Sequence, residues 1–195
     1  MECIKLAVLI SGRGSNMEKI IRACRYPRYP AEVAVVIADR HEIEGVSIAR
    51  GYGINTDVIP YIDREQFAEN ADSALQTYEP HLVVLAGLMR ILPADFVEKW
   101  PVINIHPSLL PKHPGINPHL HVIENKETMS GCTVHWAVPE VDTGQIISQM
   151  TVPVLPGDTP TDLAARVLLQ EHRLYPMTIK MLALQMLAGK PLRSK

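Results

Sequence analysis

The chain opens with the stretch "IKLAVLISGRGSNMEKIIRACRY", residues 4–26. Residues 4–10 form a continuous apolar run, which stops at Ser11 and Gly12. From 16 to 26 the apolar residues recur at the spacing of one helical face. Buried parallel strands are apolar along their whole length, and helices form the connections between them. The stretch therefore predicts a strand, a glycine-containing loop and a helix, as at the start of a parallel α/β sheet.

The same alternation continues to residue 105. An apolar run at 32–38 ends at Asp39, and helical spacing returns at 43–53 and at 63–78, where Asp63 is the expected N-cap residue. The runs at 81–87 and 102–105 read as further buried strands. Residues 1–105 therefore predict a doubly wound α/β sheet.

The pattern changes beyond residue 105. Runs at 132–138 and 145–154 are separated by "PEVDTG" and predict a hairpin. A long helix should follow, with Thr159 as N-cap, Pro160 at the first position and an end near Gly189; Pro176 should kink or interrupt it. We expect one domain over 1–195, an α/β, Rossmann-like and mostly parallel sheet extended by antiparallel strands, with a long C-terminal helix.

Composition narrows the class of protein. The 195 residues include 19 Lys and Arg against 21 Asp and Glu, so the net charge of −2 gives no indication of nucleic-acid binding. The apolar run at 4–10 is too short to span a membrane. Three scattered cysteines fit a reducing, cytoplasmic environment better than a disulfide framework. These features favour a globular protein of the cytoplasm.

Four polar features are expected at the carboxyl ends of the strands or in the hairpin turn, where α/β sheets bind ligands. They are residues 11–16, residues 89–90, Asn104 with His106, and residues 140–144. Their convergence on one edge of the sheet predicts an active site.

The first of these features, residues 11–16, suggests a phosphate cradle. Gly12 and Gly14 allow close approach of the backbone, and the helix that follows offers free amides to an anion. Two alternatives remain open here. The loop can be a tight turn capped by Ser15 or Asn16, or part of a dinucleotide site with Asp39 as the ribose-binding acid. The dinucleotide motif lacks its third glycine, because position 17 is Met.

Asn104 and His106 should leave their strand on the same face, because strand side chains alternate. An Asn amide can donate to a developing oxyanion, and a His can exchange a proton near neutral pH. Prolines at 107, 111 and 114 should stiffen the exit loop. The alternative is a His that only bonds to the backbone; an acid expected on the same rim, Asp142, favours chemistry.

The histidines raise the possibility of a metal site. Five of the eight fall between 106 and 135, and His119 and His121 are two residues apart. No His-Glu-x-x-His or Cys/His ligand pattern is present, so no metal is expected.

Several of these stretches together closely resemble the phosphoribosylglycinamide formyltransferase family of folate-dependent enzymes of purine synthesis. They are "ISGRGSN" (10–16), "LAGLMRIL" (85–92), "NIHPSLLP" (104–111), "VDTGQII" (141–147) and "LLQEHRLYP" (168–176). The resemblance implies formyl transfer from 10-formyltetrahydrofolate to the amine of phosphoribosylglycinamide, without a metal. It implies a formyltransferase domain with a phosphate-binding half at 1–105 and a folate-binding, catalytic half at 106–195, acting as a monomer or homodimer.

The resemblance also assigns residues. It implies that Asn104, His106 and Asp142 are catalytic. It implies that the phosphoribosyl substrate is bound by Gly14, Ser15 and Asn16 through its phosphate and by Glu171 through its ribose hydroxyls. Folate would contact Arg64, Met89, Arg90, Ile91, Leu92, Asn104, Val138, Pro139, Glu140, Val141 and Asp142.

Some alternatives stay open. Asn117 stands where the family commonly has a histidine, which removes a titratable group there. A formyltetrahydrofolate hydrolase would use water in place of the amine, although such enzymes usually carry an extra N-terminal domain. Sugar amines or tRNA are other possible formyl acceptors. A nicotinamide-dinucleotide-binding oxidoreductase, based on Gly12, Gly14 and Asp39, is the alternative from another class.

Overall fold

The fold is built on one seven-stranded sheet with the strand order β3-β2-β1-β4-β5-β6-β7. The computed structural model describes residues 3–192; residues 1–2 and 193–195, the ends of the domain expected over 1–195, lie outside the described residues. The strands are β1 (Ile4–Ile10), β2 (Ala31–Ala38), β3 (Thr56–Val58), β4 (Leu82–Leu85), β5 (Val102–His106), β6 (Met129–Trp136) and β7 (Ile146–Pro153). Strands β1 to β5 pair in parallel, and β6 and β7 add to β5 in antiparallel fashion. The predicted fold class is confirmed.

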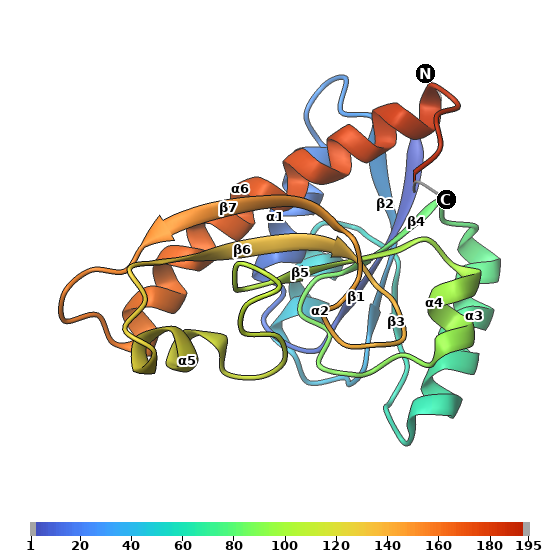
Figure 1. The fold of residues 1–195 in the computed structure, drawn as a ribbon. Helices are drawn as coiled ribbons and strands as arrows, with labels where there is room; N and C mark the ends of the chain where they lie inside the picture. Colours follow the sequence, from blue (N-terminus) through green and yellow to red (C-terminus); the bar gives the residue numbers. More distant parts are fainter. Residues whose placement is uncertain (1–2, 193–195) are drawn as a thin grey trace.

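Helices cover both faces of this sheet (Figure 1). They are α1 (Ser15–Cys24), α2 (Glu44–Gly51), α3 (Arg64–Tyr78), α4 (Ala94–Lys99), α5 (Pro118–Glu124) and α6 (Pro160–Leu187). In β1, Leu6 and Val8 belong to the core shared with α1, α2 and α6, whereas Ala7 and Leu9 belong to the core shared with α3 and α4. Alternation along a continuous apolar strand therefore fills two separate cores.

The two predicted N-caps are present. Asp63 accepts a hydrogen bond from the Gln66 amide at 2.8 Å, and Thr159 and Asp162 form a capping box at the start of α6. The expected interruption at Pro176 is wrong, because α6 runs through it as one helix of 28 residues. A proline removes only one helical hydrogen bond, and the buried residues on either side of it, Tyr175 and Ile179, hold the helix on the core.

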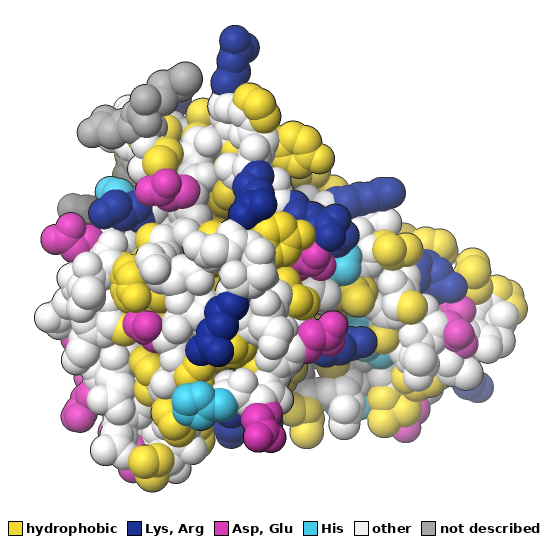
Figure 2. All heavy atoms as spheres, turned by 180° about the vertical axis from the view of Figure 1, so that it is seen from behind, with side chains coloured by type: hydrophobic (Ala, Val, Ile, Leu, Met, Phe, Trp, Pro, Cys, Tyr) yellow, Lys and Arg dark blue, Asp and Glu magenta, His cyan; other side chains and the backbone are white. Residues whose placement is uncertain are grey.

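Three short elements were not predicted: β3, α4 and α5. They contain three, six and seven residues, which is too short for a periodic apolar pattern to stand out. On the face seen in Figure 2, basic and acidic side chains are interspersed with hydrophobic ones, in keeping with the nearly balanced composition. Over residues 3–192, no helix combines the length and apolarity needed to cross a membrane.

The strand order favours ligand binding between β1 and β4. From β1 the chain moves to β2 and β3 on one side and then returns to β4 on the other, which creates a topological switch point. The loops after β1, β2 and β4 and the β6–β7 turn gather at the carboxyl edge of the parallel strands (Figure 1). Beneath this edge the fully buried Tyr175 donates its hydroxyl to the carbonyls of Leu85 and Ile103, at 3.0 and 3.1 Å.

Candidate active site

The loop after β1 has the backbone geometry of a ligand cradle. Gly14 has a φ of 73°, and a Cβ atom there would lie 2.9 Å from the Cα atom of Gly45 in α2. The Gly45 amide donates to the Gly12 carbonyl at 3.2 Å, so α2 supports the loop from behind. Gly14 is the N-cap residue of α1 and no side chain caps the helix. The capped-turn alternative is therefore not observed, and the first-turn amides of α1 have no side-chain cap.

Asn16 of α1 and Glu171 of α6 meet although they are 155 positions apart in the sequence. The Asn16 Nδ2 atom donates to Oε2 of Glu171 at 2.6 Å, and both residues are buried. Burial raises the pKa of Glu171 more than the Asn16 hydrogen bond lowers it. Among the described residues, the buried Oδ1 atom of Asn16 has no hydrogen-bond partner. This pair therefore offers a bound molecule an unused acceptor and a carboxyl group.

Asp39 is committed to protein contacts. Its Oδ2 atom accepts from the Ser11 hydroxyl at 3.0 Å and from Nε of Arg90 at 2.6 Å, and its Oδ1 atom accepts from Nε of Arg40 at 3.0 Å. Burial alone would raise the pKa of Asp39, but these hydrogen bonds lower it below its ordinary value. A ribose-binding acid would need free oxygens, so this arrangement disfavours the dinucleotide alternative.

Apart from Asn104 on β5, the predicted folate-side residues occupy two loops and one helix terminus. Met89, Ile91 and Leu92 lie in the loop after β4, where Met89 and Ile91 are exposed and Leu92 is buried. This loop contacts the loop after β1, because the Met89 amide donates to the Ser11 hydroxyl at 2.8 Å. Arg90 is held over the Tyr61 ring, 4.1 Å from its centroid. The β6–β7 turn carries Val138, Pro139, Glu140, Val141 and Asp142. Arg64 starts α3 and forms an ion pair with Glu65 at 2.7 Å.

Asn104, His106 and Asp142 come together as predicted. The two strand residues lie on one face of β5, and the turn delivers Asp142 to them. Oδ2 of Asp142 is 3.1 Å from Nδ1 of His106, and Oδ1 is 3.5 Å from Nδ2 of Asn104. The Gly115 amide also donates to Oδ2, at 2.8 Å. The result is a nearly buried carboxylate, histidine and amide at the carboxyl end of β5.

The charge state of His106 is set by opposing effects. Burial lowers the pKa of His106, and this outweighs the His113 carbonyl and the Asp142 carboxylate, which raise it. Asp142 therefore favours the imidazolium, but burial decides the net direction of the shift in the pKa of His106. Burial likewise raises the pKa of Asp142, but the hydrogen bonds from His135 and Gly115 and the neighbouring histidine charges lower it overall.

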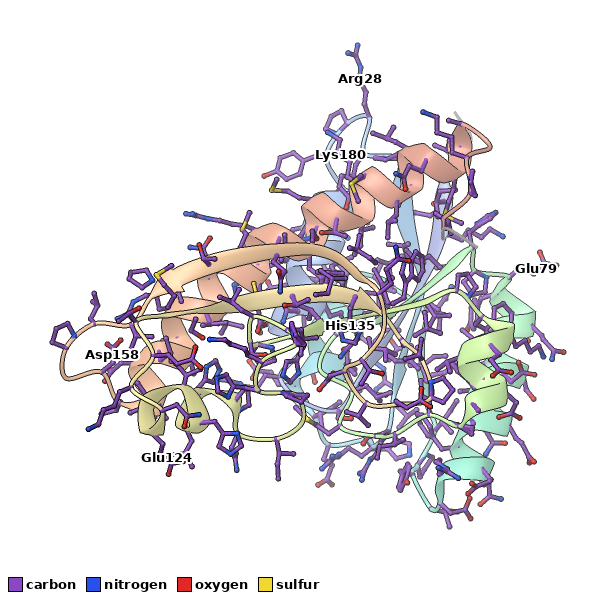
Figure 3. All side chains as sticks on the ribbon, in the orientation of Figure 1. Arg28, Glu79, Glu124, His135, Asp158 and Lys180 are labelled. Atoms are coloured by element: carbon purple, nitrogen blue, oxygen red, sulfur yellow. The ribbon has the colours of Figure 1, made fainter. Side chains whose placement is uncertain are left out.

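His135 also belongs to this cluster, a position that the sequence patterns did not predict. It lies opposite Asn104 in the β5–β6 register and is buried; Figure 3 labels it. Its Nε2 atom is 3.3 Å from Nδ2 of Asn104 and 3.4 Å from Oδ1 of Asp142, while Nδ1 is 2.9 Å from the Trp136 carbonyl. Pairing the predicted hairpin with the strand at 102–105 would have revealed it.

Comparisons with known proteins agree with this geometry. A family model described as "Formyl transferase" matches residues 4–179. The chain belongs to this formyl transferase family. It is 40% identical over 185 residues to phosphoribosylglycinamide formyltransferase of Escherichia coli, covering 92% of this chain and 87% of that protein. A crystal structure of glycinamide ribonucleotide transformylase 1 from Symbiobacterium toebii superposes with a TM-score of 0.89 at 42% identity, covering 93% of this chain and 88% of that one.

Longer proteins contain a similar segment. The human trifunctional purine biosynthetic protein adenosine-3 is 42% identical over 184 residues, which cover 92% of this chain. This formyl transferase chain spans only 18% of the length of that relative. The resemblance stated from the sequence motifs is confirmed by these matches.

Two further histidines of this formyl transferase, His113 and His119, lie near His106. His113 contacts Glu127, and burial and the charge of His106 lower the pKa of His119. Within residues 3–192, no group of three or more His, Cys, Asp or Glu side chains is arranged to hold a metal ion. Asn117 is the N-cap residue of α5 with a φ of 53°, a left-handed conformation that Asn adopts more readily than most residues.

Proposed function

We propose that this chain transfers the formyl group of 10-formyltetrahydrofolate to the glycinamide amine of phosphoribosylglycinamide. The observation that carries the proposal is the contact of Asp142 with His106 at 3.1 Å, with Asn104 beside them, on the same sheet edge as an anion-binding type of loop. The reaction so proposed uses folate as a co-substrate and no metal. The enzyme would work in the cytoplasm on small molecules, as a monomer or homodimer.

The substrate phosphate would bind the backbone of Gly14, Ser15 and Asn16. Free amides at the N-terminus of a helix of ten residues and its dipole favour an anion there. Glu171 would accept the ribose hydroxyls, and the unused Oδ1 of Asn16 is available to the same ligand. Because Glu171 comes from α6, the nucleotide side would draw on both the 1–105 half and the 106–195 half.

Folate would lie along the loop after β4 and the β6–β7 turn. The exposed side chains of Met89, Ile91 and Val141 offer apolar contact to its rings. The pterin would lie against Val138, Pro139, Glu140, Val141 and Asp142, and backbone groups of 89–92 would contact it, since the Arg90 guanidinium is held by Asp39. Arg64, exposed at the start of α3, would attract a carboxylate of the folate tail.

The chemistry follows from the residue types. The amine attacks the formyl carbon, a tetrahedral oxyanion forms, and the bond from carbon to the folate nitrogen then breaks. The amide of Asn104 and the positive charge of protonated His106 stabilise the oxyanion; losing one such donor typically costs about 3 kcal/mol in the barrier. The amine loses a proton and the folate nitrogen gains one.

Proton delivery is constrained by the contacts of His106. Its Nδ1 faces Asp142 at 3.1 Å and its Nε2 faces the His113 carbonyl at 2.9 Å. We therefore propose that a water molecule held by Asp142 and His106 carries the proton that the amine loses and the folate nitrogen gains. Acid–base assistance of this kind contributes roughly 100- to 10,000-fold.

The test is formyl transfer followed by absorbance, with and without phosphoribosylglycinamide. Turnover that depends on the ribonucleotide supports the transferase. Folate release without the ribonucleotide favours the hydrolase, and turnover with a sugar amine or tRNA in its place favours another acceptor. Binding of NAD without binding of folate would support the oxidoreductase instead. His106→Ala should remove most turnover and leave ribonucleotide binding largely unchanged.

A further inference from the structure

The backbone of His113 controls how the His106 ring is held. The His113 carbonyl lies 2.9 Å from Nε2 of His106. A carbonyl can only accept a hydrogen bond, so Nε2 must carry a hydrogen. The opposite nitrogen, Nδ1, then faces Asp142 at 3.1 Å. The position of this one carbonyl therefore fixes the orientation of the imidazole and the nitrogen that meets the carboxylate.

His113 has an unusual backbone conformation. Its φ is 53°, in the left-handed region that few residues other than glycine adopt, and Pro114 follows it. Such a conformation persists only where the surroundings enforce it. The flanking backbone is held by two contacts, since the Ser108 hydroxyl donates to the Lys112 carbonyl at 2.6 Å and the Gly115 amide donates to Asp142 at 2.8 Å. His113 itself needs a further anchor.

Glu127 provides that anchor from the segment between α5 and β6. Its Oε1 atom is 2.7 Å from Nε2 of His113, and its Oε2 atom is 3.0 Å from Nζ of Lys112. The side chains of His113 and Glu127 are only 12% and 21% exposed, so water screens this pair little. One carboxylate thus fastens two successive residues of the loop.

We propose that Glu127 is a positioning residue for the reaction: it anchors His113 so that the His113 carbonyl holds Nε2 of His106. The inference rests on the proposed function, because it assigns Glu127 an effect on that turnover through His106. The hydrogen bonds from Lys112 and His113 lower the pKa of Glu127 despite its burial, which keeps it an acceptor near neutral pH. The ionisable groups around His106 are Asp142, His135 and His119, and the His121 ring lies 6.2 Å from that of His113.

The test compares Glu127→Ala with Glu127→Gln and with Glu124→Ala as a matched control. Glu124 is an exposed carboxylate three residues earlier, at the end of α5 (Figure 3). Steady-state kinetics give kcat and the KM for phosphoribosylglycinamide. In addition, ¹⁵N NMR of the full chain reports the protonation of the two His106 nitrogens, assigned by the signals missing in His106→Gln. The NMR measurement needs no turnover, so it decides the inference even if the proposed function fails.

Glu127→Ala should lower kcat by about tenfold to a hundredfold with little change in KM, since misplacing a catalytic group by about 1 Å costs about a hundredfold. The His106 signals should shift with it. Glu127→Gln keeps an acceptor for His113 and should retain most of kcat, and Glu124→Ala should match the unaltered protein.

Unchanged His106 signals in Glu127→Ala would overturn the inference, whether or not kcat falls. If Glu127→Ala does not fold, His113→Asn replaces it. Asn tolerates the left-handed conformation but its side chain is too short to reach Glu127. The same loss of kcat and the same change in the His106 signals are expected, and their absence would again overturn the inference.

Discussion

Asp142→Asn isolates the charge beside His106. Asparagine has nearly the same shape as aspartate, and its Oδ1 atom can still accept from the Gly115 amide, which now donates to Asp142 at 2.8 Å. The charged contact it removes, from Oδ2 of Asp142 to Nδ1 of His106, measures 3.1 Å between two side chains that are each 7% exposed. The variant should therefore fold normally and change the electrostatics of the site.

The size of the effect follows from that distance. Coulomb's law gives about 1 to 5 kcal/mol for two unit charges 3.1 Å apart when the effective dielectric constant falls from about 80 to about 20. Since about 1.4 kcal/mol is a factor of ten, the imidazolium fraction above its titration midpoint should fall about tenfold or more. Burial already lowers the pKa of His106, and the loss of Asp142 removes a group that raises it.

The assay is the pH dependence of formyl transfer. A reaction that needs the imidazolium is lost as pH rises through the pKa of His106, so the variant should lose activity at lower pH than the unaltered enzyme. Its deficit should be largest at and above neutral pH and should shrink toward acid pH. Asp57→Asn, in β3 four strands away from β5, is the control. An equal deficit at every pH would refute the electrostatic reasoning.

Three further substitutions test the substrate side and the framework. Tyr175→Phe leaves two buried carbonyls, on β4 and β5, without their shared donor and should lower the free energy of unfolding in urea by about 1 to 3 kcal/mol. Gly14→Ala places a Cβ atom 2.9 Å from Cε of Met17 at a φ of 73°, so it should raise the KM for the ribonucleotide and lower the stability measured by thermal unfolding by about 1 to 2 kcal/mol. Glu171→Gln removes a buried carboxyl whose pKa is raised, mainly by burial. It should therefore stabilise the free protein at pH 7, a gain that disappears below about pH 4, while calorimetry shows weaker ribonucleotide binding.

The sequence predicted the framework because local signals coincide with it. Buried parallel strands are apolar throughout, so β1, β2, β4 and β5 stood out, and the caps at Asp63 and Thr159 marked two helix starts. The shared facing of Asn104 and His106 follows from strand alternation alone. Each of these features depends on residues that are neighbours in the chain.

The missed features depend on residues that are distant in the chain. His135 joins the site only through the antiparallel register of β6 on β5, and Glu127 meets His113 only after α5 turns the chain back. The net lowering of the pKa of His106 also depends on distant residues, because burial is a property of the whole fold. Asp142, which raises this pKa, belongs to a motif that can be recognised in the sequence. A charged neighbour can be recognised in the sequence, whereas the loss of hydration that shifts a pKa on burial depends on the folded structure.

Backbone strain connects these distant contacts to the chemistry. His113, Asn117 and Asp142 have φ values of 53°, 53° and 56°, and all three lie in the two loops that surround His106. A left-handed conformation costs an ordinary residue about 1–2 kcal/mol, less for Asn and Asp. Contacts from outside each loop segment oppose that cost: Glu127 holds His113, and His106 and Gly115 hold Asp142. The His113 carbonyl and the Asp142 carboxylate contact opposite nitrogens of the His106 imidazole, and both residues have a left-handed backbone. Weakening either anchor should therefore relax that backbone and allow the His106 ring to reorient.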